Sequence, residues 1–168
     1  MPHRKRQTEI LHLQAFTLAE VLVVLVILAI LAAVIIPSAV GSSDLTAVSA
    51  AKMVAADLQY AQNEAITAQG DITVSFDAAA KTYELRNASQ LLIHPMKHTD
   101  YVVNFGSQEG FDRLEIVSAD FNGASEVTFD ETGAPDNAGS VTLRVGSCVY
   151  RVDVAVATGK ITVTAVGS

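Results

Sequence analysis

The sequence predicts an α+β protein in which a long amino-terminal helix packs on an antiparallel β-sheet domain. An unbroken apolar run extends from Val21 to Ile36, and a helical pattern follows it as far as about Ala68. After Gly70 the pattern changes to short alternating runs separated by turn residues, which is typical of β-strands. Several short strands joined by hairpins, with no second helix among them, favour antiparallel pairing.

The first half of the helix is long enough to cross a membrane. Residues 16–36 would span about 31 Å at a rise of about 1.5 Å per residue, close to the hydrocarbon thickness of a bilayer. The thirteen Leu, Ile and Val residues of the run each favour insertion by about 0.3 to 0.6 kcal/mol, whereas one central acidic residue costs about 2.5 to 3.5 kcal/mol. We therefore expect this segment to insert although it contains Glu20, whose carboxylate then needs a partner.

Residues 1–15 are interpreted as a leader peptide rather than as part of the fold. Their basic cluster, residues 4–6, precedes the apolar run and keeps its amino end in the cytoplasm, so the domain that follows lies outside the inner membrane. An ordinary secretory signal peptide is the alternative. It needs a small-residue cleavage site beyond its apolar core, whereas Ala29 and residues 32–33 lie within the run.

The amino-terminal segment resembles the signature of type IV pilins and type II secretion pseudopilins. The features that carry this resemblance are the basic leader, Ala15, Phe16-Thr17-Leu18, Glu20, the apolar run and Pro37. Ala15 stands where the family normally has glycine. A generic signal anchor would leave Glu20 and the residues just before it unexplained.

The resemblance implies a processing reaction and an assembly contact. A prepilin peptidase and methyltransferase would cleave between Ala15 and Phe16 and then methylate the new amine of Phe16. Glu20 would pair with the terminal amine of a neighbouring subunit in a periplasmic filament. The implied partners are therefore other pilins or pseudopilins, the peptidase and the inner membrane, which the chain crosses once.

Residues 37–69 are predicted to continue the helix outside the membrane. Pro37 should kink it, because proline lacks the amide proton and clashes with the preceding turn. The helix then either bends near Gly41 or restarts at Ser43 or Asp44, and the resemblance favours one long helix. An amphipathic stripe is predicted to pack on the sheet, and Gly70 should cap the end of the helix. The stripe comprises Leu45, Val48, Ala51, Val54 or Ala55, Leu58, Ala61 and Ala65.

Residues 70–168 are predicted to form the periplasmic β-rich domain, with an irregular loop over residues 87–100. The predicted strands are Ile72–Phe76, Thr82–Arg86, Tyr101–Phe105, Leu114–Val117, Glu126–Phe129, Ser140–Arg144, Cys148–Ala155 and Lys160–Ala165. The order of these features, with the Gly133 loop and Thr158-Gly159-Lys160, looks like the H-type minor pseudopilin of type II secretion. That family usually has arginine where Gln62 stands.

The net charge argues against a nucleic-acid-binding protein, and the cysteine content argues against a fold held by intrachain disulfides. The chain has 11 basic and 18 acidic residues, for a net charge of −7. An acidic body repels phosphate, so no nucleic-acid partner is expected. The one cysteine, Cys148, permits no intrachain disulfide and is predicted to be a small buried residue in a strand.

The sequence contains no catalytic constellation, so neither an enzyme nor a cofactor is expected. Gly159-Lys160 would need a glycine at position 154 to form a phosphate loop, and Val154 stands there. His94 and His98 have a helical metal-binding spacing, but the proline between them argues against a helix, so no metal site is predicted.

Acidic residues gather in one turn-rich loop, which contains Asp130, Glu131 and Asp136. Oxygen ligands of this kind suit calcium, but the spacing of an EF-hand is missing, and a solvated loop is the favoured interpretation.

Two functions are consistent with the sequence. The first is a minor pseudopilin of a type II secretion system, whose function would depend on packing and on one charge pair. The second is a minor type IV pilin with a role in pilus assembly, adhesion or DNA uptake. DNA uptake would need a basic stripe, whereas the carboxy-terminal part offers only the scattered Arg144, Arg151 and Lys160.

Overall fold

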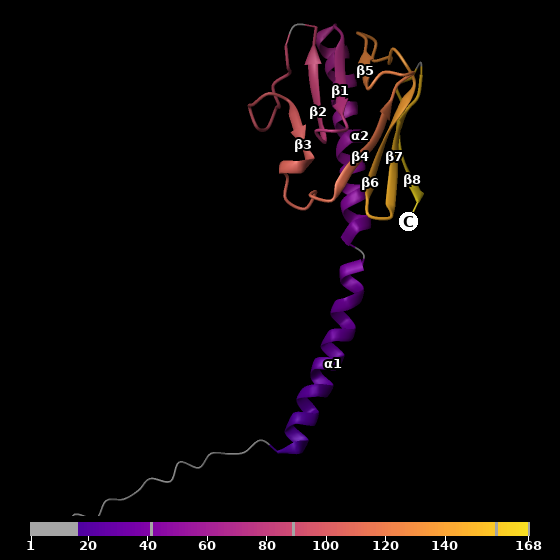
Figure 1. The fold of residues 1–168 in the computed structure, drawn as a ribbon. Coiled ribbons are helices and arrows are strands. Elements are labelled where there is room, and N and C mark those ends of the chain that lie inside the picture. Colours follow the sequence, from indigo (N-terminus) through magenta and orange to yellow (C-terminus); the bar gives the residue numbers. More distant parts are fainter. Residues whose placement is uncertain (1–16, 41, 89, 157, 168) are drawn as a thin grey trace, which may run out of the picture. The chain divides into compact units, whose positions relative to one another are not determined.

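A computed structural model describes residues 17–40, 42–88, 90–156 and 158–167 of the chain. The chain divides into two units, residues 1–40 and residues 41–168. In its described part, the first unit consists of the helix α1 (Leu18–Val40), and the second contains the helix α2 (Ser42–Ala68) and the β-strands (Figure 1).

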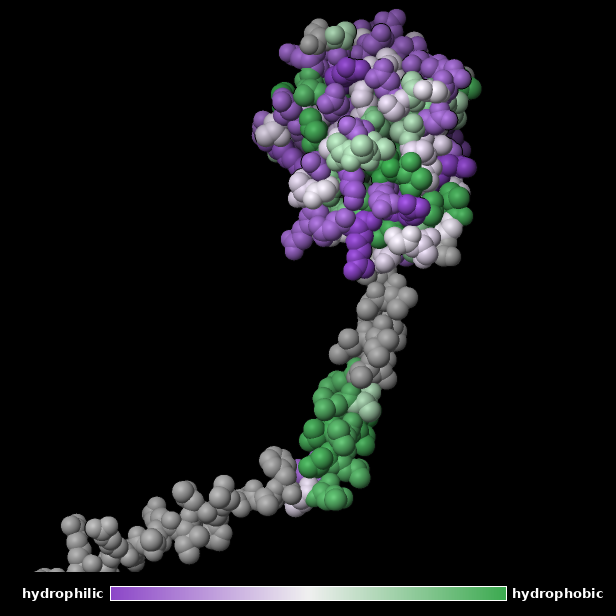
Figure 2. Space-filling model, viewed as in Figure 1, coloured by the Kyte–Doolittle hydropathy of each residue, from purple (hydrophilic) through white to green (hydrophobic). Residues whose placement is uncertain are grey.

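The helix α1 exposes apolar side chains on all sides. The exposed fraction of its large apolar residues between 18 and 31 ranges from 47% at Val24 to 84% at Leu18, and Figure 2 shows them as a continuous hydrophobic surface. A helix that is apolar all round is not stable against water and needs an apolar environment. Within the described residues, no helix meets the length and hydropathy that crossing a membrane requires.

Pro37 lies inside α1, which continues to Val40. The kink predicted at Pro37 stays a prediction. The helix α2 begins at Ser42, one residue before the earlier of the two predicted restarts. The predicted bend falls on Gly41, which lies outside the described residues.

The buried face of α2 is built mainly from alanine. It comprises Ala47, Ala50, Ala51, Val54, Ala55, Leu58, Ala61 and Ala65. The predicted stripe is therefore right from residue 51 onward but wrong at its start, since Leu45 is 67% exposed and Val48 is half-buried. The larger side chains suggested the wrong face there, because close approach of the sheets to the helix selects the smaller alanines at 47 and 50.

Gln69, rather than Gly70, takes the left-handed conformation that ends α2. Its φ is 51°, and the Gly70 amide donates a hydrogen bond to the Ala65 carbonyl oxygen at 3.2 Å. This is the Schellman arrangement, with Gln69 in the position that glycine usually takes. The Gln69 side chain offsets some of the strain, because its Nε2 donates to the Ile66 carbonyl oxygen at 2.8 Å.

The strands of the second unit form two antiparallel four-stranded sheets. The first has the order β3-β2-β1-β5 and the second the order β4-β6-β7-β8. The strands are β1 (Ile72–Asp77), β2 (Thr82–Asn87), β3 (Val102–Asn104), β4 (Leu114–Asp120), β5 (Glu126–Phe129), β6 (Gly139–Val145), β7 (Cys148–Val154) and β8 (Ile161–Gly167). The predicted α+β class and all the predicted strands are thus confirmed, mostly with ends shifted by one or two residues.

Two predicted segments differ from the structure. Phe105 begins a short 3-10 helix, η1 (Phe105–Ser107), instead of ending a strand. The segment predicted as an irregular loop, residues 87–100, forms one bridge to β2, between Leu91 and Arg86, and one within itself, between Ile93 and Asp100. Polar composition concealed this pairing, because isolated bridges leave no alternating pattern.

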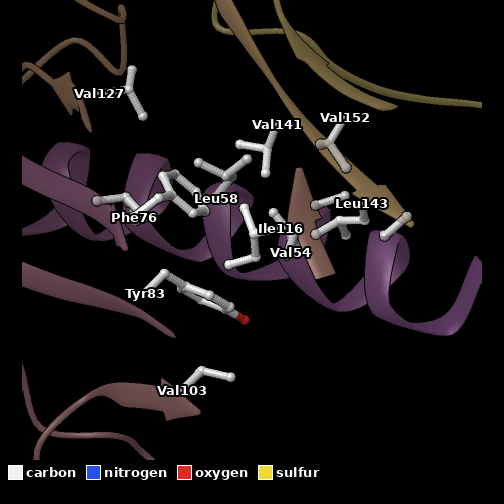
Figure 3. Packing of buried hydrophobic residues seen from close by; sticks show 14 of the residues in the cluster. Val54, Leu58, Phe76, Tyr83, Val103, Ile116, Val127, Val141, Leu143 and Val152 are labelled. Atoms are coloured by element: carbon white, nitrogen blue, oxygen red, sulfur yellow. The ribbon is translucent and has the colours of Figure 1, made fainter. Parts of the chain in front are cut away.

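The core lies between α2 and the two sheets. The helix contacts β1 and β5 of the first sheet and β6, β7 and β8 of the second. Figure 3 shows Val54 and Leu58 of α2 among side chains from both sheets, including Phe76 and Leu143. One helix face therefore provides the common surface on which both sheets pack.

We expect Leu58→Ala to lower the free energy of unfolding of a fragment that begins at Ser43. The side chain is fully buried, and large-to-small core changes of this kind cost about 2 to 5 kcal/mol. The matched control is Leu45→Ala, which should change the free energy by less than about 0.5 kcal/mol because Leu45 is exposed. Urea unfolding followed by circular dichroism measures both, and equal losses would contradict the observed helix face.

Candidate functional site

Thr17 caps the amino end of α1. The Glu20 amide donates to the Thr17 carbonyl oxygen at 3.1 Å and to the Thr17 hydroxyl oxygen at 3.2 Å. Thr17-Leu18-Ala19-Glu20 has the spacing of a capping box, a threonine followed three residues later by glutamate. Sequence reasoning missed this role of Thr17, although the spacing was there to find it.

The cap places Glu20 in the first turn of α1. Its side chain is exposed, and an acidic group in this turn interacts favourably with the positive end of the helix dipole. The two residues of the predicted cleavage site, Ala15 and Phe16, lie outside the described residues. The roles predicted for Ala15, Phe16 and Glu20 therefore stay predictions.

Cys148 is half-buried rather than buried. It is the first residue of β7 and pairs with Val145 across a tight turn at Gly146-Ser147. Strand ends next to such turns are open to solvent on one side, so the prediction of full burial was wrong.

The two histidines take part in a turn. His94 Nδ1 accepts hydrogen bonds from the amides of Met96 and Lys97 at 3.2 and 3.4 Å, and the His98 amide donates to the His94 carbonyl oxygen at 2.9 Å. The His94 ring stacks on Tyr101 with centroids 4.6 Å apart. Within the described residues, no group of three or more His, Cys, Asp or Glu is arranged to hold a metal ion.

The acidic loop uses two of its carboxylates to shape its own backbone. Asp130 Oδ1 accepts hydrogen bonds from the Thr132 hydroxyl at 2.6 Å and from the amides of Thr132 and Ala134 at 2.8 and 3.0 Å. These bonds, that from the hydroxyl above all, lower the pKa of Asp130. Asp136 Oδ1 accepts from the amides of Thr128 and Asn137 at 3.0 and 2.8 Å. Both carboxylates are therefore structural acceptors within the loop.

Gln62 holds two loops against α2. Its Nε2 donates to the carbonyl oxygen of Gly133, between β5 and β6, at 2.7 Å and to that of Thr158, between β7 and β8, at 3.3 Å. Gly159 has a φ of 59°, and a Cβ there would lie 2.2 Å from Gln62 Nε2 and 2.8 Å from the Gly133 oxygen. The glycine beside Lys160 thus serves this close packing.

Asp57 accepts hydrogen bonds from two buried tyrosines, Tyr83 in β2 and Tyr101 just before β3. The Tyr83 hydroxyl donates to Oδ2 at 2.5 Å, and the Tyr101 hydroxyl donates to Oδ1 at 3.0 Å. Tyr101 also stacks between Tyr60, with centroids 5.4 Å apart, and His94. Burial first, and then the Asp57 charge, raise the pKa of both Tyr83 and Tyr101.

In chemical terms these contacts position parts of the domain. Asp57 fixes the first sheet to α2, and Gln62 fixes the β5–β6 loop and the β7–β8 loop to the same helix. The aspartate carboxylates accept hydrogen bonds mainly from tyrosine hydroxyls and backbone amides, and the Gln62 amide donates to backbone carbonyl oxygens. These hydrogen bonds fix the position of sheet and loops on the helix.

Two family models match the chain. Residues 50–160 match the model described as type II transport protein GspH, and residues 14–36 match the model described as prokaryotic N-terminal methylation motif. The chain belongs to the GspH family. Its members are pilin-like structural subunits, so the predicted resemblance to type IV pilins and pseudopilins is confirmed.

Solved structures of similar chains include two minor subunits. One is the minor pseudopilin EpsH from the type 2 secretion system of Vibrio cholerae, at 16% identity and a TM-score of 0.49; the match covers 71% of this chain and 96% of that one. The other is the type IV minor pilin FimU of Pseudomonas aeruginosa, at 18% identity and a TM-score of 0.48, covering 69% and 90%. No curated protein matches the sequence.

We expect Asp57→Asn to lower the pKa of Tyr83 and Tyr101 and to destabilise the domain. The substitution removes the charge that raises both values and leaves one hydroxyl facing an amide donor, a loss of about 1 to 3 kcal/mol. Ultraviolet difference titration of tyrosinate and chemical unfolding measure the two effects. Asp71→Asn, at an exposed residue just after α2, is the control.

The hydrogen bonds between Asp57 and the two tyrosines predict how the stability of the domain changes with pH. The folded-state pKa of each tyrosine is raised above its unfolded value of 10.0. The stability that they contribute is therefore present in full below about pH 10 and is lost as the pH rises further. A wild-type domain that loses no more stability in this range than Asp57→Asn would contradict the assignment.

Proposed function

We propose that this protein is a minor pseudopilin, a structural and non-enzymatic subunit of the periplasmic pseudopilus of a type II protein secretion system. The observation that carries the proposal is the presence, in one chain, of the methylation motif at residues 14–36 and of the GspH match at residues 50–160. The apolar surface of α1 supports it, because such a helix needs lipid or other helices around it.

The chain has four parts in this proposal. Residues 1–15 are a leader that a prepilin peptidase removes, and Phe16 becomes the methylated first residue. Residues 16–36 anchor the subunit in the inner membrane and later lie in the filament, and Pro37 kinks the helix as it leaves the bilayer. Residues 37–69 continue the helix outside the membrane, and residues 70–168 form the periplasmic domain.

Glu20 guides a subunit to its neighbour. An unpaired carboxylate among apolar side chains is costly, and a buried ion pair that loses one partner typically loses about 3 to 5 kcal/mol. The carboxylate is therefore satisfied when it meets the terminal amine of a neighbouring Phe16. The cap by Thr17 supports this role, because it holds Glu20 in the first helical turn, next to that terminus.

A minor type IV pilin is the second candidate, since the methylation motif fits both systems. DNA uptake is the least supported of its roles. Arg144 and Arg151 are already bound in ion pairs with Glu115 and Asp153, at 2.5 and 2.8 Å. Together with the net charge of −7, these ion pairs disfavour binding of phosphate.

The cleavage site can be tested directly. Co-expression with a prepilin peptidase should yield a mature chain that begins at N-methylated Phe16, because the leader and the junction match the substrates of that enzyme. Intact-mass analysis measures the product. Ala15→Gly should be processed at least as fast as the wild type, and cleavage beyond Ile36 would indicate an ordinary signal peptide instead.

We expect Glu20→Leu to be processed and inserted normally but to assemble poorly. The change removes an unfavourable charge from the apolar segment and also removes the partner of the neighbouring amine. Crosslinking to other pseudopilins from positions just after Pro37 should fall by about tenfold or more, which corresponds to 1.4 kcal/mol or more, and type II secretion should fall with it.

Glu20→Gln is the matched variant, because it keeps the shape of the side chain and removes the charge; it should behave like Glu20→Leu. Crosslinking of Glu20→Leu at the wild-type level would show that the charge pair does not recruit the subunit. Loss of pilus function with normal secretion would favour the type IV pilin.

A further inference from the structure

The two sheets end in four edge strands, β3 and β5 in the first sheet and β4 and β8 in the second. The outer side of an edge strand carries backbone amides and carbonyl oxygens that can pair with another chain. Proteins usually block such edges with short strands, charges, bulges or covering loops. Comparing the four edges shows which of them this chain leaves open.

Three of the edges are blocked. β3 is only three residues long. The outer side of β5 is taken by the loop that follows it, through the bridge between Phe129 and Pro135 and the hydrogen bond from the Asp136 amide to the Thr128 carbonyl oxygen at 2.8 Å. β4 has a bulge in its middle and carries the acidic residues Glu115 and Asp120.

Among the residues that the structure describes, none protects the outer edge of β8 in these ways over most of its length. Its seven residues, Ile161–Gly167, include neither a charged residue nor proline, and most are β-branched residues that favour strands. Its one irregularity against β7 lies near the carboxyl end, beyond Ala165. Figure 1 shows β8 beside β7, on the side away from β6.

The hydrogen-bonding register shows which backbone groups of β8 point outward. The Ala155 amide donates to the Lys160 carbonyl oxygen at 3.0 Å, so this pair faces inward. Hydrogen-bonded and non-hydrogen-bonded pairs alternate along an antiparallel ladder. In the register of β8 on β7, Thr162 and Thr164 also bond to β7, and the outward groups belong to Ile161, Val163 and Ala165.

We propose that the outer edge of β8 pairs, in the assembled filament, with an extended and uncharged segment of a different pilin-like subunit. The inference rests on the proposed function, since it takes the chain to be a filament subunit. Main-chain hydrogen bonds supply the affinity in this mode of recognition, and the side chains of alternate residues supply the specificity. An uncharged segment fits because β8 itself offers no charge to pair.

A second copy of this chain does not fit the same edge. Residues 41–168 carry 8 basic and 16 acidic residues, so two copies repel each other. A closed dimer through one β8 edge would pair the two copies of the strand antiparallel about a two-fold axis. That axis would reverse α2 in one copy, whereas subunits anchored by their amino ends in one membrane share one direction.

The test is hydrogen–deuterium exchange of the mature full-length chain in detergent. Each of the other pilin-like subunits of the same cell, purified separately, is the probe. With the correct subunit, the peptide that covers β8 should lose uptake at about three amides, those that point outward. Binding that leaves the exchange of β8 unchanged, or no binding by any of these subunits, would overturn the proposal.

Val163→Pro tests the main-chain pairing. Proline removes an outward amide and leaves the hydrogen bonds to β7 in place, so subunit binding should weaken by about tenfold or more. The Val163 side chain is partly buried against the core, so binding is compared at a temperature below the thermal midpoints of both proteins. Thr164→Ala, which changes an exposed side chain and no backbone group, is the control and should bind normally. Equal binding by Val163→Pro and the wild type would overturn the proposal.

Two further outcomes separate this inference from the function on which it rests. Protection of β8 that grows with the concentration of the chain alone would assign the edge to a second copy and overturn the proposed partner. Normal Phe16 processing and Glu20-dependent crosslinking, with β8 unprotected in the assembled state, would overturn the pairing and leave the proposed function standing.

Discussion

The domain depends on the close approach of two sheets to one face of α2. Five of the eight residues on that face are alanines with no exposed surface. Alanine loses no side-chain entropy on burial and lets a sheet lie near the helix backbone. A larger residue at any of these places would displace the elements packed against it, because interiors packed to this density do not absorb added volume cheaply. The alanine content of α2 is therefore a packing requirement and not merely a helix-forming preference.

Polar side chains beside this face hold the first sheet and two loops in a defined position on the helix. Asp57 reaches the first sheet through two tyrosine hydroxyls, and Gln62 reaches the two loops on either side of β6 and β7. Apolar packing alone tolerates sliding of one layer over another, whereas hydrogen bonds have definite partners. The two kinds of contact together give α2 a defined position in the domain, so that the sheet edges present constant surfaces.

Local sequence patterns predicted the helices and strands well, but they could not predict contacts between residues that are distant in the sequence. Turn residues between short alternating runs located every strand. The burial of Ala47 in place of Leu45 could not be read from the helix by itself, because it depends on how near the sheets lie. Glycine at position 70 suggested a cap that Gln69 provides instead, with its own side chain bonded to the preceding turn. Asp57 is separated from its two tyrosines by 26 and 44 residues, so no local spacing reveals the pair. The cap at Thr17 is the opposite case, since the pattern was local and was overlooked.

The packing around Gln62 couples the evolution of three distant positions. A side chain at residue 159 would meet Gln62 and the Gly133 carbonyl oxygen, and one at residue 133 would meet Ile66 at 2.7 Å. Shortening residue 62 would remove only the first obstacle at 159, because the positive φ and the carbonyl oxygen remain. The effects of substitutions at these three sites should therefore not be additive, because the residues are in contact. The glycines must persist whatever stands at 62, whereas residue 62 is free to vary among donors long enough to reach both loops.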